Sequence, residues 1–290
     1  MNDMPKITQD MINLYDRFTH VTRDRAAYLD DLAKIVGDRA TAERVTALIQ
    51  ANAGATPVTP ENDPRLTIES VTLPNGLVGY LAMPKGEARK APAVVVIHEN
   101  RGLVPHIKDV VRRVAAEGFV AFGPDYLAPL GGTPEDEDLG RDMIAKLERP
   151  AVIDLSLKAI DYLRGHAACN GKVGVVGFCW GGGIANATAV AAGDKLQAAV
   201  AYYGAQPKAE DVSKIRARMM LHYAGEDERI NAGIDAYKAA LEANKTAHEI
   251  FVYPGAQHAF NNDSAPARFH QEASALAWGR TIGMFKSALA

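Results

Sequence analysis

The sequence predicts an α/β protein in which a mostly parallel, doubly wound sheet follows an N-terminal helical extension. Short apolar runs alternate with helical segments along most of the chain, as right-handed parallel crossovers require. Two alternating segments joined by Pro74-Asn75-Gly76 predict an antiparallel hairpin at the start of the sheet. Residues 8–51, in contrast, show apolar residues only at helical spacing and contain no proline. These three observations define the predicted fold class.

The N-terminal region is expected to form two or three amphipathic helices with a break near Gly37 and Asp38. Residues 52–64, which are rich in Pro, Ala, Thr and Asn, are typical of a linker. We therefore divide the chain into a helical extension (1–55), a linker (56–65) and an α/β domain (66–290). The apolar stripe of the extension must be covered. Packing on the α/β domain is favoured over a homodimer contact between the helices of two copies.

The strands and helices of the α/β domain follow one another in a regular order. The strands are expected at residues 66–73, 77–83, 93–98, 119–123, 172–178, 198–203, 219–223 and 248–253. The helices are expected at residues 108–117, 151–164, 181–192, 234–243 and 265–287. The polar segment before helix 151–164 receives no element. A hairpin ahead of alternating strands and helices fits the α/β-hydrolase architecture.

Composition excludes several classes of function. The formal net charge of −3 and the pI near 6.2 give no signature for binding nucleic acid. No apolar run reaches the roughly 18 residues of a membrane span, and the first residues lack the pattern of a secretory signal. Cys169 and Cys179 are expected at opposite ends of one strand, too far apart for a disulfide. We expect both to be free thiols in the reducing cytoplasm.

The segment from Val173 to Gly183 carries the strongest functional signal. A buried strand is expected to end at Gly177 and a helix of small residues to begin at Gly181, so Cys179 lies on the turn between them. Gly-x-Cys-x-Gly is the nucleophile elbow with cysteine in place of serine, and its glycines relieve the crowding of a tight turn. The positive end of the following helix favours the thiolate. The alternative is a buried structural cysteine on a glycine-rich turn.

A nucleophile needs a base, and the base needs a group that orients it. In this architecture the order along the chain is nucleophile, acid, histidine. Asp227 follows the strand 219–223, and His258 follows the strand 248–253 through a Pro-Gly turn. Because the carboxyl ends of parallel strands share one edge of the sheet, Cys179, Asp227 and His258 are expected to meet in one cleft. Taken singly, Asp227 could be a capping acid and His258 a loop histidine without a task.

Three segments in this order resemble the dienelactone hydrolase (carboxymethylenebutenolidase) family. They are Gly-Phe-Cys-Trp-Gly-Gly at 177–182, Gly-Glu-Asp at 225–227 and Gly-Ala-Gln-His-Ala-Phe at 255–260. The resemblance extends from about Leu66 to the C-terminus. It implies a Cys179–His258–Asp227 triad that opens lactones or cleaves esters. Family members also carry a glutamate that contacts the resting thiol, and the resemblance assigns this role to Glu99.

The remaining expected site residues surround this triad. The backbone N–H groups of Trp180 and Asn100 are expected to form the oxyanion hole. In the family an arginine shortly after the catalytic histidine grips the substrate carboxylate, but Asn262 stands at that position here. Arg101 and Arg141 are therefore the candidates for gripping an anionic substrate.

We predict a cytoplasmic hydrolase of small esters or lactones that acts through a thioester on Cys179 and needs no cofactor. No metal site is indicated, because the other histidines show no metal-binding spacing: His20, His98, His106, His166, His222, His248 and His270. Two alternatives remain open. One is a non-hydrolytic thiol protein in which Cys179 senses redox state, and the other is an idle interaction module that uses its N-terminal helices. Hydrolysis of a chromogenic short-chain ester separates the first hypothesis from both.

Overall fold

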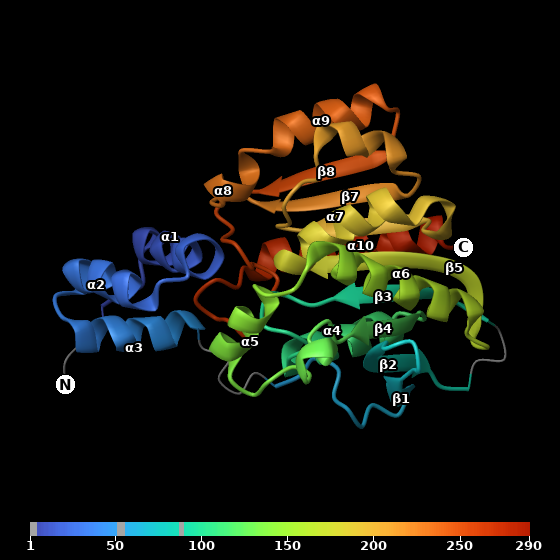
Figure 1. Ribbon diagram of the computed structural model, residues 1–290, viewed down its shortest axis with the longest axis horizontal. Coiled ribbons are helices and arrows are strands. Elements are labelled where there is room, and N and C mark those ends of the chain that lie inside the picture. Colours follow the sequence, from blue (N-terminus) through green and yellow to red (C-terminus); the bar gives the residue numbers. More distant parts are fainter. Residues whose placement is uncertain (1–4, 51–55, 87–89) are drawn as a thin grey trace.

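The computed structural model describes residues 5–50, 56–86 and 90–290. Its centre is an eight-stranded sheet with the order β1-β2-β4-β3-β5-β6-β7-β8 (Figure 1). The strands are β1 (Leu66–Thr72), β2 (Val78–Pro84), β3 (Ala91–Ile97), β4 (Val120–Pro124), β5 (Cys169–Phe178), β6 (Ala198–Tyr202), β7 (Arg218–Ala224) and β8 (His248–Tyr253). β2 is antiparallel to both β1 and β4, and all other neighbouring strands are parallel. The predicted fold class is confirmed.

Helices cover both faces of this sheet (Figure 1). They are α4 (Pro105–Ala116), α5 (Glu137–Ile144), α6 (Arg149–Gly165), α7 (Trp180–Ala192), α8 (Glu228–Asn231), α9 (Ile234–Ala243) and α10 (Gln271–Ala288). Short 3-10 turns occur at η2 (Ala128–Leu130), η3 (Gly193–Lys195) and η4 (Ala209–Lys214). α4 and α10 contribute to the apolar cluster on one face, and α6, α7 and α9 contribute to the cluster on the other.

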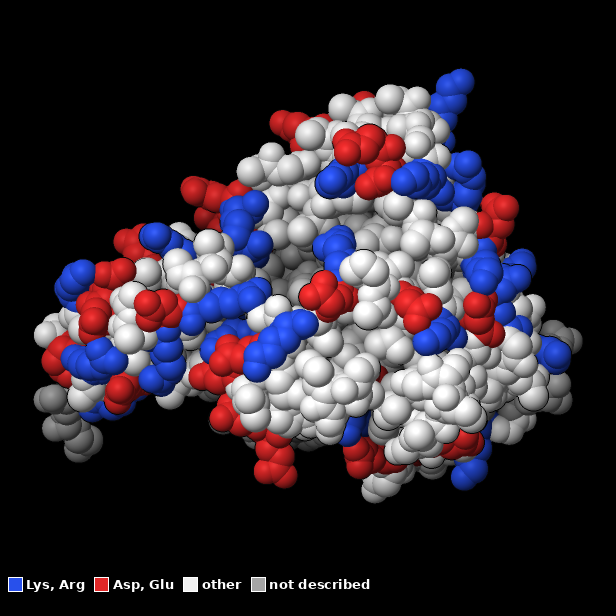
Figure 2. Space-filling model, in the orientation of Figure 1, with Lys and Arg blue, Asp and Glu red and all other residues white. Residues whose placement is uncertain are grey.

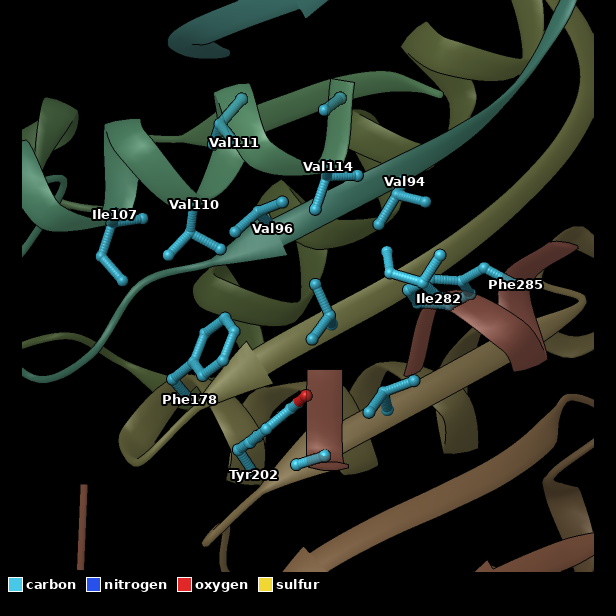
Figure 3. Close-up of a cluster of buried hydrophobic side chains, with 14 of the residues drawn as sticks. Val94, Val96, Ile107, Val110, Val111, Val114, Phe178, Tyr202, Ile282 and Phe285 are labelled. Carbon is cyan, nitrogen blue, oxygen red and sulfur yellow. The ribbon is translucent and has the colours of Figure 1, made fainter. Parts of the chain in front are cut away.

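The two apolar clusters form the core, one on each side of the sheet. Figure 3 shows part of the first cluster, in which Val94 and Val96 of β3 lie beside Val110 of α4. Because successive residues of a strand point to opposite faces, Val95 and Ile97 belong to the second cluster. Helices therefore cover β3 on both sides, which explains why this strand is an uninterrupted apolar run.

The N-terminal residues form three α-helices, α1 (Gln9–Arg17), α2 (Arg25–Val36) and α3 (Arg39–Gln50), with the π-helical turn η1 (Phe18–Thr22) after α1. We call these residues, 9–50, the N-terminal extension. It buries an apolar cluster of its own, which includes the rings of Tyr15, Phe18 and Tyr28. In Figure 1 the arrowheads of β3, β7 and β8 point toward the extension. The extension thus lies at the edge where parallel strands present functional residues.

Two expectations for local structure were wrong. The last helix begins at Gln271 rather than at residue 265, because the side chain of His270 caps it by accepting from the N–H of Ala273. The polar segment before α6 contains α5, whose start is capped by the side chain of Asp136.

Residues 51–55, at the predicted boundary between extension and linker, lie outside the described residues. The division into extension, linker and α/β domain stays a prediction. Within the described ranges, no helix is both long and apolar enough to cross a bilayer.

Candidate active site

Cys179 lies on a strained turn between β5 and α7. Its φ of 55° falls in the left-handed region, which residues with a Cβ rarely adopt. A Cβ added at Gly177 would overlap the carbonyl oxygen of Gly181, and a Cβ at Gly181 would overlap that of His98. The two glycines therefore let strand and helix approach closely enough to hold Cys179 in this conformation. Its buried side chain lies at the N-terminal end of α7.

His258 and Asp227 form a buried pair. His258 lies in the loop after β8, and its Nδ1 donates to Oδ2 of Asp227 at 2.5 Å. Asp227 also caps α8. Burial opposes a charge on the imidazole, but the Asp227 carboxylate and the Cys179 sulfur raise the pKa of His258 to about 10. Burial likewise opposes a charge on Asp227, but the attraction of His258 keeps the pKa of this carboxyl below its usual value. The two groups therefore stabilise each other as an imidazolium–carboxylate pair.

The other ring nitrogen of His258 is free for chemistry. Among the described residues, Nε2 of His258 is buried and has no hydrogen-bond partner. A ring nitrogen of His258, one of His20 and Sγ of Cys179 lie within 4.8 Å of one another. The geometry therefore brings the predicted nucleophile, base and orienting acid into one place.

His20 reaches the same thiol from the N-terminal extension. Its Nε2 lies 3.1 Å from Sγ of Cys179, and its ring meets that of His258 edge to face at 4.7 Å between centroids. Its Nδ1 lies 2.9 Å from the backbone oxygen of Asp16, which can only accept. Nδ1 therefore carries the hydrogen, and Nε2 directs a lone pair at the sulfur. Burial and the positive charges of His258 and Arg229 lower the pKa of His20 well below its usual value, which favours this neutral form.

His20 is a site residue that was not predicted from the sequence. His20 and Cys179 are separated by 159 positions, so no spacing rule connects them. The residue lies in the π-helical turn η1, which ends at Arg23 with a φ of 54°. Such turns occur frequently at functional sites, but propensities and periodicity do not distinguish them from the end of an ordinary helix.

Glu99 and Asn100 follow β3 and border the thiol on another side. Nδ2 of Asn262 donates to Oε2 of Glu99 at 2.9 Å, so the residue at the family's arginine position holds this carboxylate. In the described parts of the chain, Oε1 of Glu99 is buried without a hydrogen-bond partner. Glu99, Asn100 and Cys179 line a cavity of about 20 Å³, which has room for about one water. Trp180 begins α7, where the first N–H groups of a helix have no partner within it.

The two arginines expected to grip an anion are engaged by neighbouring side chains. Arg101 donates to Glu137 at 2.5 Å and also to the hydroxyl of Tyr15. Arg141 pairs with Asp138 at 2.8 Å and with Asp142 at 3.1 Å. These contacts count against a role in gripping substrate, which stays a prediction for both residues.

A cleft of about 330 Å³ opens beside Cys179, and residues of the N-terminal extension form part of its wall. Figure 2 shows a hollow between the extension and the rest of the molecule, with Lys and Arg atoms around it. The lining includes Arg23, Arg149 and Arg229, which have no ion-pair partner within the described residues. The cleft wall therefore carries positive charge outside any ion pair, although the carboxylates of Asp16 and Asp227 offset part of the charge of Arg229.

Residues 77–289 match the model of the Dienelactone hydrolase family. A Yersinia pestis protein provisionally named carboxymethylenebutenolidase is 33% identical over 224 residues, which cover 72% of this chain and 83% of that protein. A similarly named Synechocystis sp. protein is 32% identical over 240 residues, covering 76% of this chain and 96% of that protein. A Klebsiella pneumoniae structure, provisionally described as a dienelactone hydrolase, is similar with a TM-score of 0.67 and 27% identity, covering 76% and 98% of the two chains. The N-terminal extension lies outside the family match.

Proposed function

Because the chain belongs to the dienelactone hydrolase family and is a hydrolase of the α/β-hydrolase fold, we propose that it cleaves small carboxylic esters or lactones with Cys179 as nucleophile. The observation that carries the proposal is the buried pair beside the thiol. With Nδ1 of His258 bound to Asp227 at 2.5 Å, Nε2 is the nitrogen left to exchange a proton with the sulfur. Asp227 fixes the tautomer of His258 and stabilises its cation.

The proposed reaction passes through a thioester. In the form of the site that reacts, His258 is neutral at Nε2 and takes the proton of the thiol. This transfer produces the imidazolium–carboxylate pair, and the Cys179 thiolate attacks the carbonyl carbon. The oxyanion accepts hydrogen bonds from the backbone N–H groups of Trp180 and Asn100. The carbon–oxygen bond then breaks, and His258 returns the proton to the leaving oxygen. Water gives a proton to His258 and attacks the thioester, which releases the carboxylic acid and regenerates the thiol.

Two further residues act on the resting thiol. The S–H group of Cys179 donates to Nε2 of His20, 3.1 Å away, and this contact fixes the rotamer of the cysteine. Glu99, which lines the same small cavity, disfavours the thiolate through like-charge repulsion. The thiol is therefore protected until substrate enters and changes these contacts.

We further propose that the substrate carries a negative charge. Arg23, Arg149 and Arg229 line the cleft without an ion-pair partner in the described ranges, and an anionic acyl or alcohol group would compensate their charge. The cleft volume of about 330 Å³ lies at the lower end of the usual range for small-molecule sites. A compact anionic ester or lactone fits both the charge and the size.

Hydrolysis of a chromogenic short-chain ester tests the proposal, with Cys179→Ala and Cys179→Ser as the variants. We expect Cys179→Ala to lose several orders of magnitude in kcat while the fold is retained, and Cys179→Ser to keep only weak activity. Acid quenching of the wild type during turnover should trap an acyl group on the peptide that contains Cys179. Turnover by Cys179→Ala at the wild-type rate would refute the assignment, and Cys169→Ala is the matched control.

Two points from the sequence complete the proposal. A reducing cytoplasm would keep Cys169 and Cys179 as the free thiols that the structure contains. The homodimer through the N-terminal helices stays a prediction.

A further inference from the structure

Cys179, His20 and His258 form a cluster of one thiol and two imidazoles, the two ligand types that zinc prefers. Sγ of Cys179 and one ring nitrogen of each histidine lie within 4.8 Å of one another. The Nε2 of His20 is already 3.1 Å from Sγ. In a tetrahedral zinc site the ligand atoms are roughly 3.4 Å apart, given Zn–N and Zn–S lengths of about 2.1 and 2.3 Å. Because the three separations are at most 4.8 Å, shifts of about an ångström in the ligand side chains would bring the atoms to the separations that zinc requires.

The contacts behind these ligands also suit a metal. Nδ1 of His258 donates to the Asp227 carboxylate, and Nδ1 of His20 lies on the backbone oxygen of Asp16. A histidine that binds a metal usually holds its second nitrogen in this way, on a carboxylate or a backbone carbonyl. In addition, Nε2 of His258 is buried with no hydrogen-bond partner among the described residues, which is an independent sign of an unfilled ligand position.

From this arrangement we propose that Cys179, His20 and His258 bind one Zn²⁺ ion through Sγ and two Nε2 atoms. Thiolate and imidazole ligands select zinc over magnesium or calcium. The Cys179 thiolate and the Asp227 carboxylate together balance the two charges of the ion. The fourth position faces the cleft of about 330 Å³, which is lined by all three ligands and open to a water or a small anion.

Zinc binding displaces the protons that the thiol and His258 carry, and these protons pass to solvent. The bound thiolate can no longer attack a carbonyl carbon. If the proposed function holds, Zn²⁺ is therefore a reversible inhibitor whose affinity depends on a ligand from the N-terminal extension. The zinc site itself does not depend on the hydrolytic proposal, since binding is measured directly.

Titration of the full-length apoprotein with Co²⁺ as a spectroscopic probe tests the site. We expect one equivalent to bind with thiolate-to-cobalt charge-transfer absorption and tetrahedral ligand-field bands, and Cys179→Ser to lack the charge-transfer absorption. His20→Gln should raise the Kd for Zn²⁺ by about tenfold or more. His166→Gln, which changes a histidine that does not line the cleft, is the matched control and should bind as the wild type does.

X-ray absorption spectroscopy of the zinc-loaded wild type tests the ligand set without any substitution. One sulfur and two imidazoles in the first shell would support the proposal, even if His20→Gln were to fold poorly. A shell with one sulfur and a single imidazole would overturn it. Equal Zn²⁺ affinities for the wild type and a folded His20→Gln variant would overturn it as well.

Discussion

Nε2 of His20 lies 3.1 Å from Sγ of Cys179, although the two residues are 159 positions apart in the chain. The contact joins the N-terminal extension to the nucleophile elbow. Because the lone pair of a neutral imidazole points at the sulfur, the extension does more than cover apolar surface. It contributes a functional group to a site whose predicted nucleophile, base and orienting acid come from the α/β part of the chain.

We predict that Asp227→Asn lowers kcat by roughly a thousandfold or more while KM changes little. The amide preserves the shape of the pocket but disturbs the tautomer and cation of His258. Glu226→Gln and Glu228→Gln are the matched controls, because they neutralise the neighbouring acids. Steady-state kinetics on one ester decides the matter. An Asp227→Asn enzyme with full activity, beside an inactive Glu228→Gln enzyme, would move the orienting role to Glu228.

The Asp227–His258 pair also predicts how stability depends on pH. In the folded state the pKa of His258 is raised from 6.5 to about 10. The contribution of this histidine to the free energy of unfolding is therefore fully present below about pH 6.5 and is lost as the pH rises through about 10. The lowered pKa of Asp227 adds stability that is present above its usual value of 3.8 and lost as the pH falls further.

Urea unfolding of the wild type and Asp227→Asn measures this dependence. The difference in unfolding free energy should be largest near pH 5 to 6 and shrink toward pH 10, in line with these two shifts. Asp161→Asn, which breaks an exposed pair with Lys195, should show no such trend. A difference that grows between pH 7 and 10 would contradict the imidazolium–carboxylate pair.

Glu99→Gln should shift the alkylation of Cys179 by iodoacetamide to lower pH. The substitution removes a negative charge that opposes the thiolate, while the amide can still interact with Asn262. The measurement is the alkylation rate as a function of pH, with Glu117→Gln as a control for an exposed carboxylate. If the two profiles of wild type and Glu99→Gln coincide, Glu99 does not act on the thiol.

Two sets of arginines can be compared for binding an anionic substrate. Arg149→Gln should raise KM for an anionic ester by about fivefold and leave a neutral ester of the same size unaffected, because its guanidinium is exposed in the cleft. Arg101→Ala should harm both esters alike, since Glu137 and Tyr15 already engage this side chain. A selective loss of the anionic ester in Arg101→Ala alone would instead support the role expected for Arg101 from the sequence.

Gly177→Ala should destabilise the protein by about 3 kcal/mol or more and abolish hydrolysis. The added Cβ would overlap the carbonyl oxygen of Gly181, which is backbone and cannot move aside without reshaping the elbow. Gly279→Ala in α10 meets no atom within 4 Å and should stabilise the helix by up to about 1 kcal/mol. Chemical denaturation measures both effects, and a Gly177→Ala protein as stable as the wild type would refute the steric account.

The fold class and the order of the elements could be predicted from the sequence, because both depend on local periodicity. The apolar run of β3 and the helical spacing of α9 record which faces are buried, wherever the partners lie in the chain. The elbow at Cys179 could also be predicted, since the two glycines that permit it, Gly177 and Gly181, lie two positions before and after the cysteine. The approach of Asp227 to His258 could be predicted because strand ends in a parallel sheet share one edge.

The groups that surround the thiol, in contrast, depend on how distant segments pack together. The approach of His20 depends on how the N-terminal extension docks on the strand ends, and no periodicity encodes that docking. Arg101 donates hydrogen bonds to Glu137 and Tyr15, which belong to two other segments of the chain. The position of Arg101 after β3 gave no sign that these partners would hold its guanidinium. Local patterns report burial and turns, whereas contacts between distant segments depend on the packing of the whole chain.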